Sequence, residues 1–311
     1  MKAAQIKEYG DISAINIEEV DKPTAGEGQV LIEVKAASLN PFDSAIRAGY
    51  MKEMIPLELP VTLGGDIAGV VAEVGEGVTA FQTGDKVYGQ ANVVTGASGA
   101  FAQFSVTSAN QIAKMPSSLE FNDAASLPLV GSSAIQALNE HIKLEEGQKI
   151  LIIGGSGGIG AVAIAIAKNI GAHVVTTVPT DGVSYAKELG ADEVIDYKTQ
   201  SIPEDSEFDA VFDTAGGEAF DTSLKFIKKG GIMVTMAAQP DEDKAKELGI
   251  QVIGQMTQIT STVLDTLSKH IDSGVVKSRI AKTFSLDQVQ DAFKAREEES
   301  HIGKILLSVN Q

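Results

Sequence analysis

The sequence predicts an α/β protein with two domains, one rich in short β-strands and one built on a doubly wound parallel sheet. At 311 residues, the chain exceeds the usual size of a single hydrophobic core. Its first third holds short apolar stretches divided by glycine-containing turns. From about Asn122 onward, the sequence pattern predicts strands that alternate with helices.

The first third has the alternation of half-buried strands. Val30–Ala37 alternates apolar and polar residues with a period of two. Asp66–Val74 and Lys86–Gly89 are further predicted strands, and turns at 75–77 and 83–85 separate them. Short strands at this spacing predict a compact, barrel-like domain.

The rest of the chain alternates strands with helices, as a doubly wound parallel sheet requires. The predicted strands are 149–153, 173–178, 193–196, 210–213, 231–236 and an outer strand at 250–255. The predicted helices are 123–138, broken early by Pro128, then 160–169, 183–189, 220–227 and 262–273. A helix at 288–295 and a strand at 304–309 end the chain.

The most informative segment runs from Lys149 to Lys168, KILIIGGSGGIGAVAIAIAK. An apolar strand leads into G-x-G-x-x-G and then a helix of small residues, which is the context that makes this pattern a dinucleotide fingerprint. In this pattern Gly155 permits the tight turn, Gly157 lets a pyrophosphate approach the backbone, and Gly160 lets the helix pack closely on the sheet. Amides at the helix N-terminus then bind the anion. The predicted contacts are Gly155, Ser156, Gly157, Gly158, Ile159 and Gly160.

Composition excludes several classes of function. The net charge of −17 disfavours nucleic acid and anionic lipid as partners, and no basic patch interrupts it. The absence of cysteine excludes disulfides, thiolate metal sites and a cysteine nucleophile. Because the N-terminal segment lacks the apolar core of a signal peptide, we expect a cytoplasmic protein.

Several motifs in order along the chain resemble the medium-chain dehydrogenase/reductase superfamily, in its zinc-independent, quinone oxidoreductase-like branch. They are 36–43 (AASLNPFD), 64–71 (GGDIAGVV), 84–89 (GDKVYG), 127–134 (LPLVGSSA), the glycine turn, 189–192 (LGAD) and 303–306 (GKIL). The resemblance covers nearly the whole chain. It implies a GroES-like domain at 1–122 that is completed by 274–311, with a Rossmann domain at 123–273 between them. It also implies a nicotinamide cofactor, a small-molecule substrate in a cleft, and commonly a homodimer.

Departures from the metal-bearing relatives indicate the chemistry. Those relatives carry a cysteine ligand where this chain has Asn40, and Gly-His-Glu where it has Gly64-Gly65-Asp66. The four histidines lie outside these motifs, so we expect no metal site. Without a metal Lewis acid, reduction of a quinone or an α,β-unsaturated carbonyl compound is favoured over oxidation of simple alcohols. Hydrogen-bond donors alone can stabilise the charge that develops on the acceptor oxygen.

Three residues are candidates for the substrate side, by their place in the family's motifs. Asn40 can donate to the acceptor oxygen or position the nicotinamide, although Asn-Pro is also a common turn. Asp43 lies near the implied cleft, or simply pairs with Arg47 four residues on. Tyr50 matches an aromatic residue of the implied substrate pocket, or is a surface tyrosine.

Further candidates lie on the cofactor side. Ser133 stands where the family usually has threonine near the nicotinamide, although a hydroxyl there can also cap a helix. Ala215, Gly216 and Ala237 follow predicted strands, and ligands bind outside the carboxyl ends of such strands.

The end of the second Rossmann strand bears on the choice of cofactor. Thr177 and Thr180 flank Pro179, which occupies the position where NAD-binding proteins usually carry an acid. The missing carboxylate favours NADPH, and Tyr197 matches a family residue near its 2′-phosphate. Asp181 follows closely and leaves NADH open, and Lys187 is the nearest basic residue.

The sequence therefore predicts an NADPH-dependent, zinc-independent reductase of quinones or activated alkenes that assembles as a homodimer. One alternative is an enone or enoyl reductase with a narrow physiological substrate. Another, of a different class, is a low-turnover NADPH-binding protein with a regulatory or structural role.

Overall fold

A computed structural model describes residues 1–310 of the chain. The chain divides into two compact units. The first comprises Met1–Leu129, Ile259–Ser268 and Ser278–Gln311, and the second comprises Val130–Gln258 and Lys269–Lys277. Residues 123–129 and 259–268 thus group with the first unit. The domain limits of 1–122 with 274–311, and of 123–273, remain a prediction.

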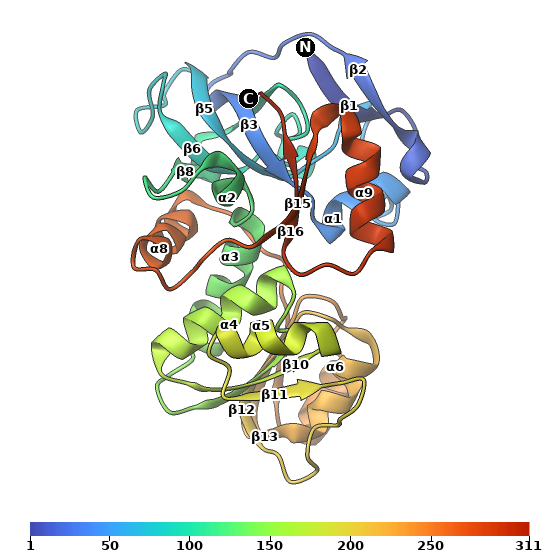
Figure 1. The fold of residues 1–311 in the computed structure, drawn as a ribbon, viewed down its shortest axis with the longest axis vertical. Coiled ribbons are helices and arrows are strands. Elements are labelled where there is room, and N and C mark those ends of the chain that lie inside the picture. The colour runs from blue at the N-terminus through green and yellow to red at the C-terminus, as the bar shows by residue number, and fades with distance from the viewer. Residues whose placement is uncertain (311) are drawn as a thin grey trace. The chain divides into compact units, whose positions relative to one another are not determined.

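The first unit is built on a small antiparallel sheet and a larger mixed sheet, in which only β15 and β16 are parallel (Figure 1). A small sheet has the order β2-β1-β4, and a larger one has the order β15-β16-β3-β5-β6-β8, with β7 also paired to β3. The strands are β1 (Lys2–Ile6), β2 (Ile15–Glu19), β3 (Gln29–Ser38), β4 (Val61–Thr62), β5 (Asp66–Val74), β6 (Lys86–Gln90), β7 (Phe104–Ser108), β8 (Ile112–Lys114), β15 (Ile280–Ser285) and β16 (Lys304–Ser308). Its helices are α1 (Pro41–Ala48), α2 (Phe121–Ala125) and α9 (Val289–Glu298).

The last strand of the chain completes the larger sheet. β16 pairs antiparallel with β3, with Leu306 opposite Ser38 and Ser308 opposite Ala36, and the two strands lie side by side in Figure 1. This arrangement confirms the GroES-like architecture in which C-terminal strands return to the N-terminal domain.

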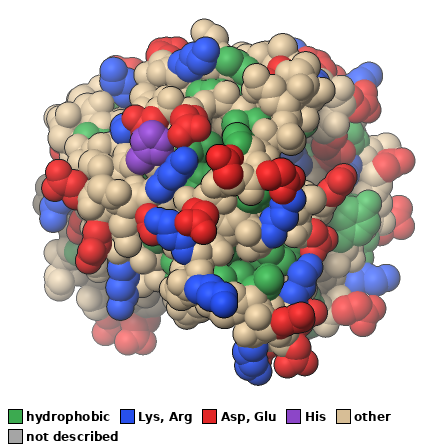
Figure 2. Space-filling model, turned by 90° about the horizontal axis from the view of Figure 1, so that it is seen from below, with side chains coloured by type: hydrophobic (Ala, Val, Ile, Leu, Met, Phe, Trp, Pro, Cys, Tyr) green, Lys and Arg blue, Asp and Glu red, His purple; other side chains and the backbone are tan. Residues whose placement is uncertain are grey.

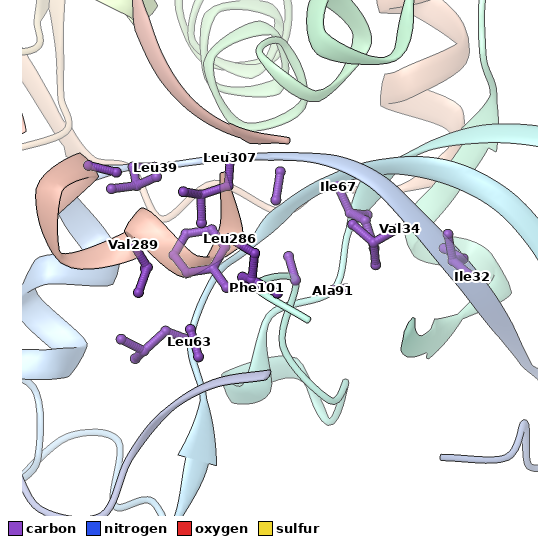
Figure 3. Packing of buried hydrophobic residues seen from close by; sticks show 14 of the residues in the cluster. Ile32, Val34, Leu39, Leu63, Ile67, Ala91, Phe101, Leu286, Val289 and Leu307 are labelled. Carbon is purple, nitrogen blue, oxygen red and sulfur yellow. The ribbon is translucent and has the colours of Figure 1, made fainter. Parts of the chain in front are cut away.

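Aliphatic and phenylalanine side chains fill the core of this unit, as the absence of tryptophan requires. Phe101, Leu63, Leu286 and Val289 gather there from distant parts of the chain (Figure 3). The ring of Phe101 meets that of Phe293 edge-on, with centroids 6.1 Å apart. Burial of these side chains fixes α9 against the sheets.

The second unit is the predicted parallel sheet, with the strand order β11-β10-β9-β12-β13-β14. Its strands are β9 (Lys149–Ile153), β10 (His173–Val178), β11 (Glu193–Asp196), β12 (Phe208–Asp213), β13 (Ile227–Thr235) and β14 (Gln251–Gly254). Its helices are α3 (Pro128–Ile135), which continues as a π-helix at Gln136–Ile142, α4 (Gly158–Ile170), α5 (Val183–Glu188), α6 (Gly217–Ser223) and α7 (Glu242–Leu248). Most of α8 (Ser261–Asp272) groups with the first unit. All neighbouring strands of this sheet are parallel. The Rossmann fold class is therefore confirmed.

The order of the strands reverses direction at β9. From β9 the chain moves outward to β10 and β11, then returns to β12 on the other side of β9. Open α/β sheets bind ligands at this switch point, outside the carboxyl ends of the strands. The glycine turn follows β9 and therefore lies at the switch point.

Two predicted helices were wrong in extent. The segment 220–227 is helical only to Ser223, and a 3₁₀ turn over Leu224–Phe226 follows. Ile227 already pairs with Phe208 as the first residue of β13, because its buried β-branched side chain suits the sheet. In the segment 123–138 the break at Pro128 is confirmed, because Pro128 begins α3, but helical structure starts earlier, at Phe121, and continues to Ile142.

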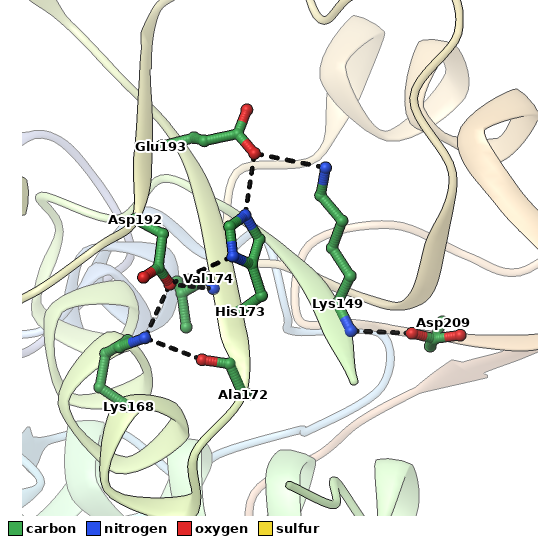
Figure 4. A network of polar contacts seen from close by, with 8 residues as sticks. All are labelled: Lys149, Lys168, Ala172, His173, Val174, Asp192, Glu193 and Asp209. Atoms are coloured by element: carbon green, nitrogen blue, oxygen red, sulfur yellow. Dashed lines mark hydrogen bonds and ion pairs between the residues drawn. The ribbon is translucent and has the colours of Figure 1, made fainter. Parts of the chain in front are cut away.

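A network of charged side chains joins the amino-terminal ends of the Rossmann strands (Figure 4). His173 Nε2 lies 2.9 Å from Glu193 Oε1, and Lys168 Nζ donates to Asp192 Oδ2 over 2.7 Å. The amide of Lys149 donates to Asp209 Oδ2 over 2.7 Å. These contacts fix the ends of the strands opposite the switch point.

Acidic and basic side chains are interspersed on the face shown in Figure 2, without a continuous basic patch. Within residues 1–310, no helix is long and apolar enough to cross a membrane. The cytoplasmic location stays a prediction.

β14 is an edge strand of the sheet, as predicted, and edges of this kind are normally covered. We expect a homodimer that pairs through this edge. Ile253→Arg in β14 should therefore shift the protein toward monomer in sedimentation velocity at micromolar concentration. Val194→Arg on β11, at the opposite edge, is the matched control and should leave the dimer intact. A wild-type protein that sediments as a monomer would exclude this arrangement.

Candidate functional site

The glycine turn begins with a backbone conformation that glycine favours. Gly154 has a φ of +83°, and the amides of Gly154 and Gly155 both donate to the carbonyl of Thr177, over 3.1 and 3.2 Å. The left-handed residue of the turn is thus Gly154, and Gly155 permits the tight turn through its lack of a side chain. Gly155 is needed for space, because a Cβ there would lie 2.0 Å from Thr176 Oγ1.

The roles of the other two glycines differ from each other. A Cβ on Gly160 would lie 2.2 Å from the carbonyl oxygen of Gly154, so Gly160 allows the close approach of α4 to the turn, as predicted. A Cβ on Gly157 would meet only Gly154 O, at 3.3 Å, and φ there is −75°. A Cβ at Gly157 would therefore make one tight contact with a backbone oxygen, which is much less severe than the overlap at Gly160.

The N-terminus of α4 presents backbone amides to a ligand. The helix begins at Gly158, and the bond from Ala161 N to Gly157 O closes its first turn at 2.9 Å. The amides of Gly158, Ile159 and Gly160 precede this bond and have no acceptor within the helix. Together with the helix dipole, they can hold an anionic pyrophosphate at the turn that contains Ser156.

A buried carboxylate organises the two loops that follow β12 and β13. Asp213 Oδ1 accepts the amides of Ala215 and Gly216, over 3.0 and 2.9 Å. Its other oxygen accepts from Thr235 Oγ1 over 2.7 Å, and that hydroxyl oxygen accepts the amide of Ala237 over 3.2 Å. The three predicted residues Ala215, Gly216 and Ala237 therefore belong to one framework. Asp213 and Thr235, which hold it together, were not predicted.

The ends of β10 and β11 are also linked. Thr180 Oγ1 donates to Asp196 Oδ2 over 2.7 Å, and this bond holds the pKa of Asp196 below its usual value. The amide of Lys198 donates to the other oxygen over 3.0 Å. Tyr197 is exposed beside this pair. A carboxylate thus lies at the ends of β10 and β11, but it belongs to Asp196 of β11 and not to the residue at position 179, which is proline.

Ser133 lies within α3, so the alternative that it caps a helix was wrong. Its side chain is fully buried, and its Oγ lies 2.7 Å from Thr257 Oγ1. Gln255 Nε2 donates to the carbonyl of Ser133 over 3.1 Å. Ser133 therefore joins α3 to the segment that follows β14.

In the first unit, Asn40 and Asp43 form the beginning of α1. Asn40 is the N-cap, Pro41 occupies the first turn, and Asp43 Oδ2 accepts the amide of Asn40 over 2.7 Å. This is a favourable helix start, so the alternative that Asn40 and Pro41 form only a turn was wrong. Arg47 forms its ion pair with Glu297 of α9, at 3.3 Å, and not with Asp43.

The side chain of Asn40 is held at both ends. Its Nδ2 donates to Asp66 Oδ2 over 2.9 Å, and its Oδ1 accepts from Lys304 Nζ. Lys304 Nζ also donates to the carbonyl of Leu39 over 2.9 Å. Asp66 further accepts from Ser38 Oγ and from the amide of Leu129, each over 3.1 Å. We call Ser38, Asn40, Asp43, Asp66 and Lys304 the polar cluster.

Burial sets the protonation of the cluster. It raises the pKa of Asp43 to about 7, and the amide of Asn40 opposes the shift. Burial also raises the pKa of Asp66 and lowers the pKa of Lys304, while each partner's charge opposes the shift of the other. Two acids and one base thus share a site from which water is excluded.

Tyr50 does not join the cluster. It follows the C-cap of α1 at Gly49, and its side chain is 83% exposed, whereas Asn40 is 3% exposed. Within the polar cluster, Ser38, Asp66 and the more distant Lys304 were not predicted as site residues; Asp66 and Lys304 share no signal in the sequence. Both stand in motifs that marked the resemblance, but nothing in their local sequence indicates that β16 carries Lys304 to β5. Within residues 1–310, no group of three or more His, Cys, Asp or Glu side chains is arranged to hold a metal ion.

Comparison with known proteins agrees with this architecture. Residues 26–117 match the family model of the alcohol dehydrogenase GroES-like domain. Residues 189–307 match a model described as zinc-binding dehydrogenase.

Individual relatives cover almost the whole chain. The 2-methylene-furan-3-one reductase of Solanum lycopersicum is 33% identical over 99% of this chain and 79% of its own. The chloroplastic NADPH-dependent alkenal/one oxidoreductase of Arabidopsis thaliana has the same identity and coverage. The solved quinone oxidoreductase of Coxiella burnetii is 30% identical, covers 100% of this chain and 99% of its own, and superimposes with a TM-score of 0.91.

A GroES-like unit combined with a Rossmann unit is the architecture of medium-chain dehydrogenases/reductases. Within that superfamily, the chain belongs to the quinone oxidoreductase-like family.

The geometry of the glycine turn makes Gly157→Val a specific probe of cofactor binding. The Cβ would make only one tight contact within the protein, at 3.3 Å from Gly154 O, but the side chain would extend to where the pyrophosphate approaches the backbone. We expect a folded variant with the wild-type circular dichroism spectrum and at least about tenfold weaker binding of NADPH in calorimetric titration. Gly160→Val is the contrasting variant, expected to lose stability, because its Cβ would clash with Gly154 O. Unchanged affinity in Gly157→Val would mean that the anion binds elsewhere.

The buried carboxyl of Asp43 should make stability depend on pH. The pKa of this carboxyl in the folded protein, about 7, lies above its ordinary value of 3.8, so folding takes up a proton between these limits. The stability that this group contributes is therefore lost as pH rises through 7. Asp43→Asn keeps an acceptor for the Asn40 amide, and should reduce the loss of unfolding free energy between pH 5 and pH 7.5 by about 2 kcal/mol. Urea unfolding at both pH values tests this, with Asp21→Asn at the surface as control. Equal pH dependence in wild type and Asp43→Asn would contradict it.

Proposed function

We propose that this protein is an NADPH-dependent, zinc-independent reductase that transfers hydride to quinones or α,β-unsaturated carbonyl compounds. The observation that carries the proposal is the glycine turn at the switch point of the sheet. There, three backbone amides at the start of α4 are suited to bind an anion. NADPH supplies the hydride when it is bound. The chain's own residues bind and orient the cofactor and the acceptor.

The choice of NADPH rests on charge at the end of β10 and on the relatives. Pro179 offers no carboxylate to the adenosine ribose, and the Arabidopsis relative is named as NADPH-dependent. The negative charge of Asp196 opposes the binding of a 2′-phosphate at this end. Its two oxygens, however, already accept hydrogen bonds from Thr180 and from the amide of Lys198. Thr177, Thr180 and Tyr197 are the proposed contacts at this end, and Ser133, Ala215, Gly216 and Ala237 are those at the nicotinamide end.

Lys304 supports reduction without zinc. Its ammonium lies 4.0 Å from Asp66 Oδ2 and donates to Asn40 Oδ1, at the motifs where metal-bearing relatives keep ligands. A buried cation already neutralises the carboxylate, so a divalent ion there would meet electrostatic repulsion. The acceptor oxygen would then be stabilised by hydrogen-bond donors, and Asn40, Asp43 and Tyr50 remain the proposed substrate-side residues.

The names of the relatives support the substrate class. They reduce a quinone, an alkenal or enone, and a methylene furanone, as their names state. In each acceptor a carbonyl is conjugated with a carbon–carbon double bond, so hydride adds to carbon while charge moves to oxygen. A narrow enone reductase and a low-turnover NADPH-binding protein are the alternatives.

Steady-state oxidation of NADPH with a panel of quinones, enones and saturated ketones tests the proposal, together with elemental analysis. We expect turnover with quinones or enones, none with saturated ketones, no stoichiometric zinc, and activity that survives a chelator. Turnover with one enone alone would favour the narrow reductase. Binding of NADPH without turnover would favour the regulatory or structural role, and one zinc per chain lost together with activity would contradict the zinc-independent reaction.

If Asn40 and Tyr50 stabilise charge on the acceptor oxygen, their removal should slow chemistry more than it weakens NADPH binding. Loss of one such donor typically slows the step by about a hundredfold. We expect Asn40→Ala and Tyr50→Phe to slow single-turnover hydride transfer to an enone by up to this factor, and less for a quinone, which is easier to reduce. Tyr9→Phe, at a tyrosine that packs against Gly49, is the matched control. Parental rates in both variants would show that the two residues only shape the pocket.

A further inference from the structure

The first residue after β14, Gln255, carries a buried amide oxygen without a partner. The residue is 7% exposed, and its backbone amide donates to the carbonyl of Thr235 over 2.9 Å. Within residues 1–310, Gln255 Oε1 is one of four buried side-chain polar atoms that lack a hydrogen bond. A buried acceptor of this kind is unfavourable unless a donor reaches it.

The orientation of this amide is determined by its neighbours. Gln255 Nε2 donates to the carbonyl of Ser133 over 3.1 Å and to Thr257 Oγ1 over 3.3 Å. A carbonyl oxygen only accepts, so the nitrogen must lie on that side and the oxygen on the other. Because Ser133 Oγ and Thr257 Oγ1 also bond to each other, the side chain of Gln255 is fixed before any ligand arrives.

The position of Gln255 in the sheet indicates what the oxygen meets. A doubly wound sheet binds a dinucleotide as two halves about the switch point, and the adenosine ribose lies at the end of the second strand. That strand is β10, so the adenosine half belongs to β10 and β11. The nicotinamide half then belongs to β12, β13 and β14, and Gln255 stands at the carboxyl end of the last of these.

Nicotinamide offers a donor of the required kind. Its carboxamide carries an NH₂ group, and a fixed side-chain carbonyl is a suitable acceptor for it. We propose that Gln255 is a cofactor-binding residue whose Oε1 accepts a hydrogen bond from the carboxamide NH₂ of the nicotinamide. Gln255 thereby selects an amide at this position of the ring. This inference rests on the proposed function, since it needs a nicotinamide cofactor.

Binding of three ligands by calorimetry tests the inference without any turnover. They are NADP⁺, its 3-acetylpyridine analogue, in which a methyl group replaces the NH₂, and 2′,5′-ADP, which lacks the nicotinamide half. We expect the wild-type protein to bind NADP⁺ about tenfold more tightly than the acetylpyridine analogue, because the analogue leaves Oε1 unpaired. Gln255→Leu should bind the two dinucleotides equally and bind 2′,5′-ADP as the wild type does.

The matched control is Gln251→Leu, at the exposed glutamine that begins the same strand, and it should keep the wild-type discrimination. Equal binding of both dinucleotides by the wild type would overturn the inference, and this comparison requires no variant to fold. Discrimination that survives in Gln255→Leu would also overturn it. If Gln255→Leu weakens both dinucleotides to the same extent, the oxygen meets the ribose and the inference is wrong. A wild-type protein that binds none of the three ligands would instead refute the proposed cofactor itself.

Discussion

The burial of one carboxylate, Asp66, constrains the first unit more than any other interaction. A carboxylate that is 1% exposed must find donors within the protein, because water cannot supply them. Ser38 donates to it from the end of β3, Asn40 from the start of α1, and Leu129 through its backbone amide. Lys304 adds positive charge from β16. Four separate segments are thereby held in one arrangement.

This arrangement also explains the burial of Asn40. Its carboxamide is a bridge, with the nitrogen on Asp66 and the oxygen on Lys304, so its orientation is fixed by an acid and a base together. Loss of either charged partner would leave the other buried and unpaired, which is more costly than the pair is favourable. The cluster therefore serves to position the start of α1 more than to stabilise the fold.

In the second unit, backbone amides, rather than charged side chains, are the groups that can face a ligand. Its glycine turn depends on Gly154 for the left-handed residue, and on Gly155 and Gly160 for close approach. Asp213 plays the organising part there, because it holds the loops after β12 and β13 by their amides. A protein with a net charge of −17 can thus present donors to an anion without a basic patch.

Much of the Rossmann unit could be predicted from the sequence, because its signals are local. The strand at 149–153 and the turn after it carry their periodicity and glycines in one window, and β9 and β10 have the predicted bounds. The helix at 41–48 was missed although Asn40, Pro41 and Asp43 are a good helix start, since eight residues give little periodicity. The polar cluster could not be predicted, because Asp66 and Lys304 meet only through the pairing of β16 with β3. Gln255 was missed because its partners Ser133 and Thr257 come from two different segments.

The return of the last strand also has a consequence for folding during synthesis. β3 forms pairs with β5 and β7 from residues made early, but its pairing with β16 must wait until Lys304–Ser308 has left the ribosome. Nearly the whole Rossmann unit is synthesised in between, so only the Ala36–Ser38 part of one flank of β3 waits unpaired, while β7 already covers Gln29–Glu33. Contacts this distant in sequence form slowly, and an unpaired strand edge invites association with other chains. Until β16 pairs, this short stretch of β3 therefore remains open to association with other chains.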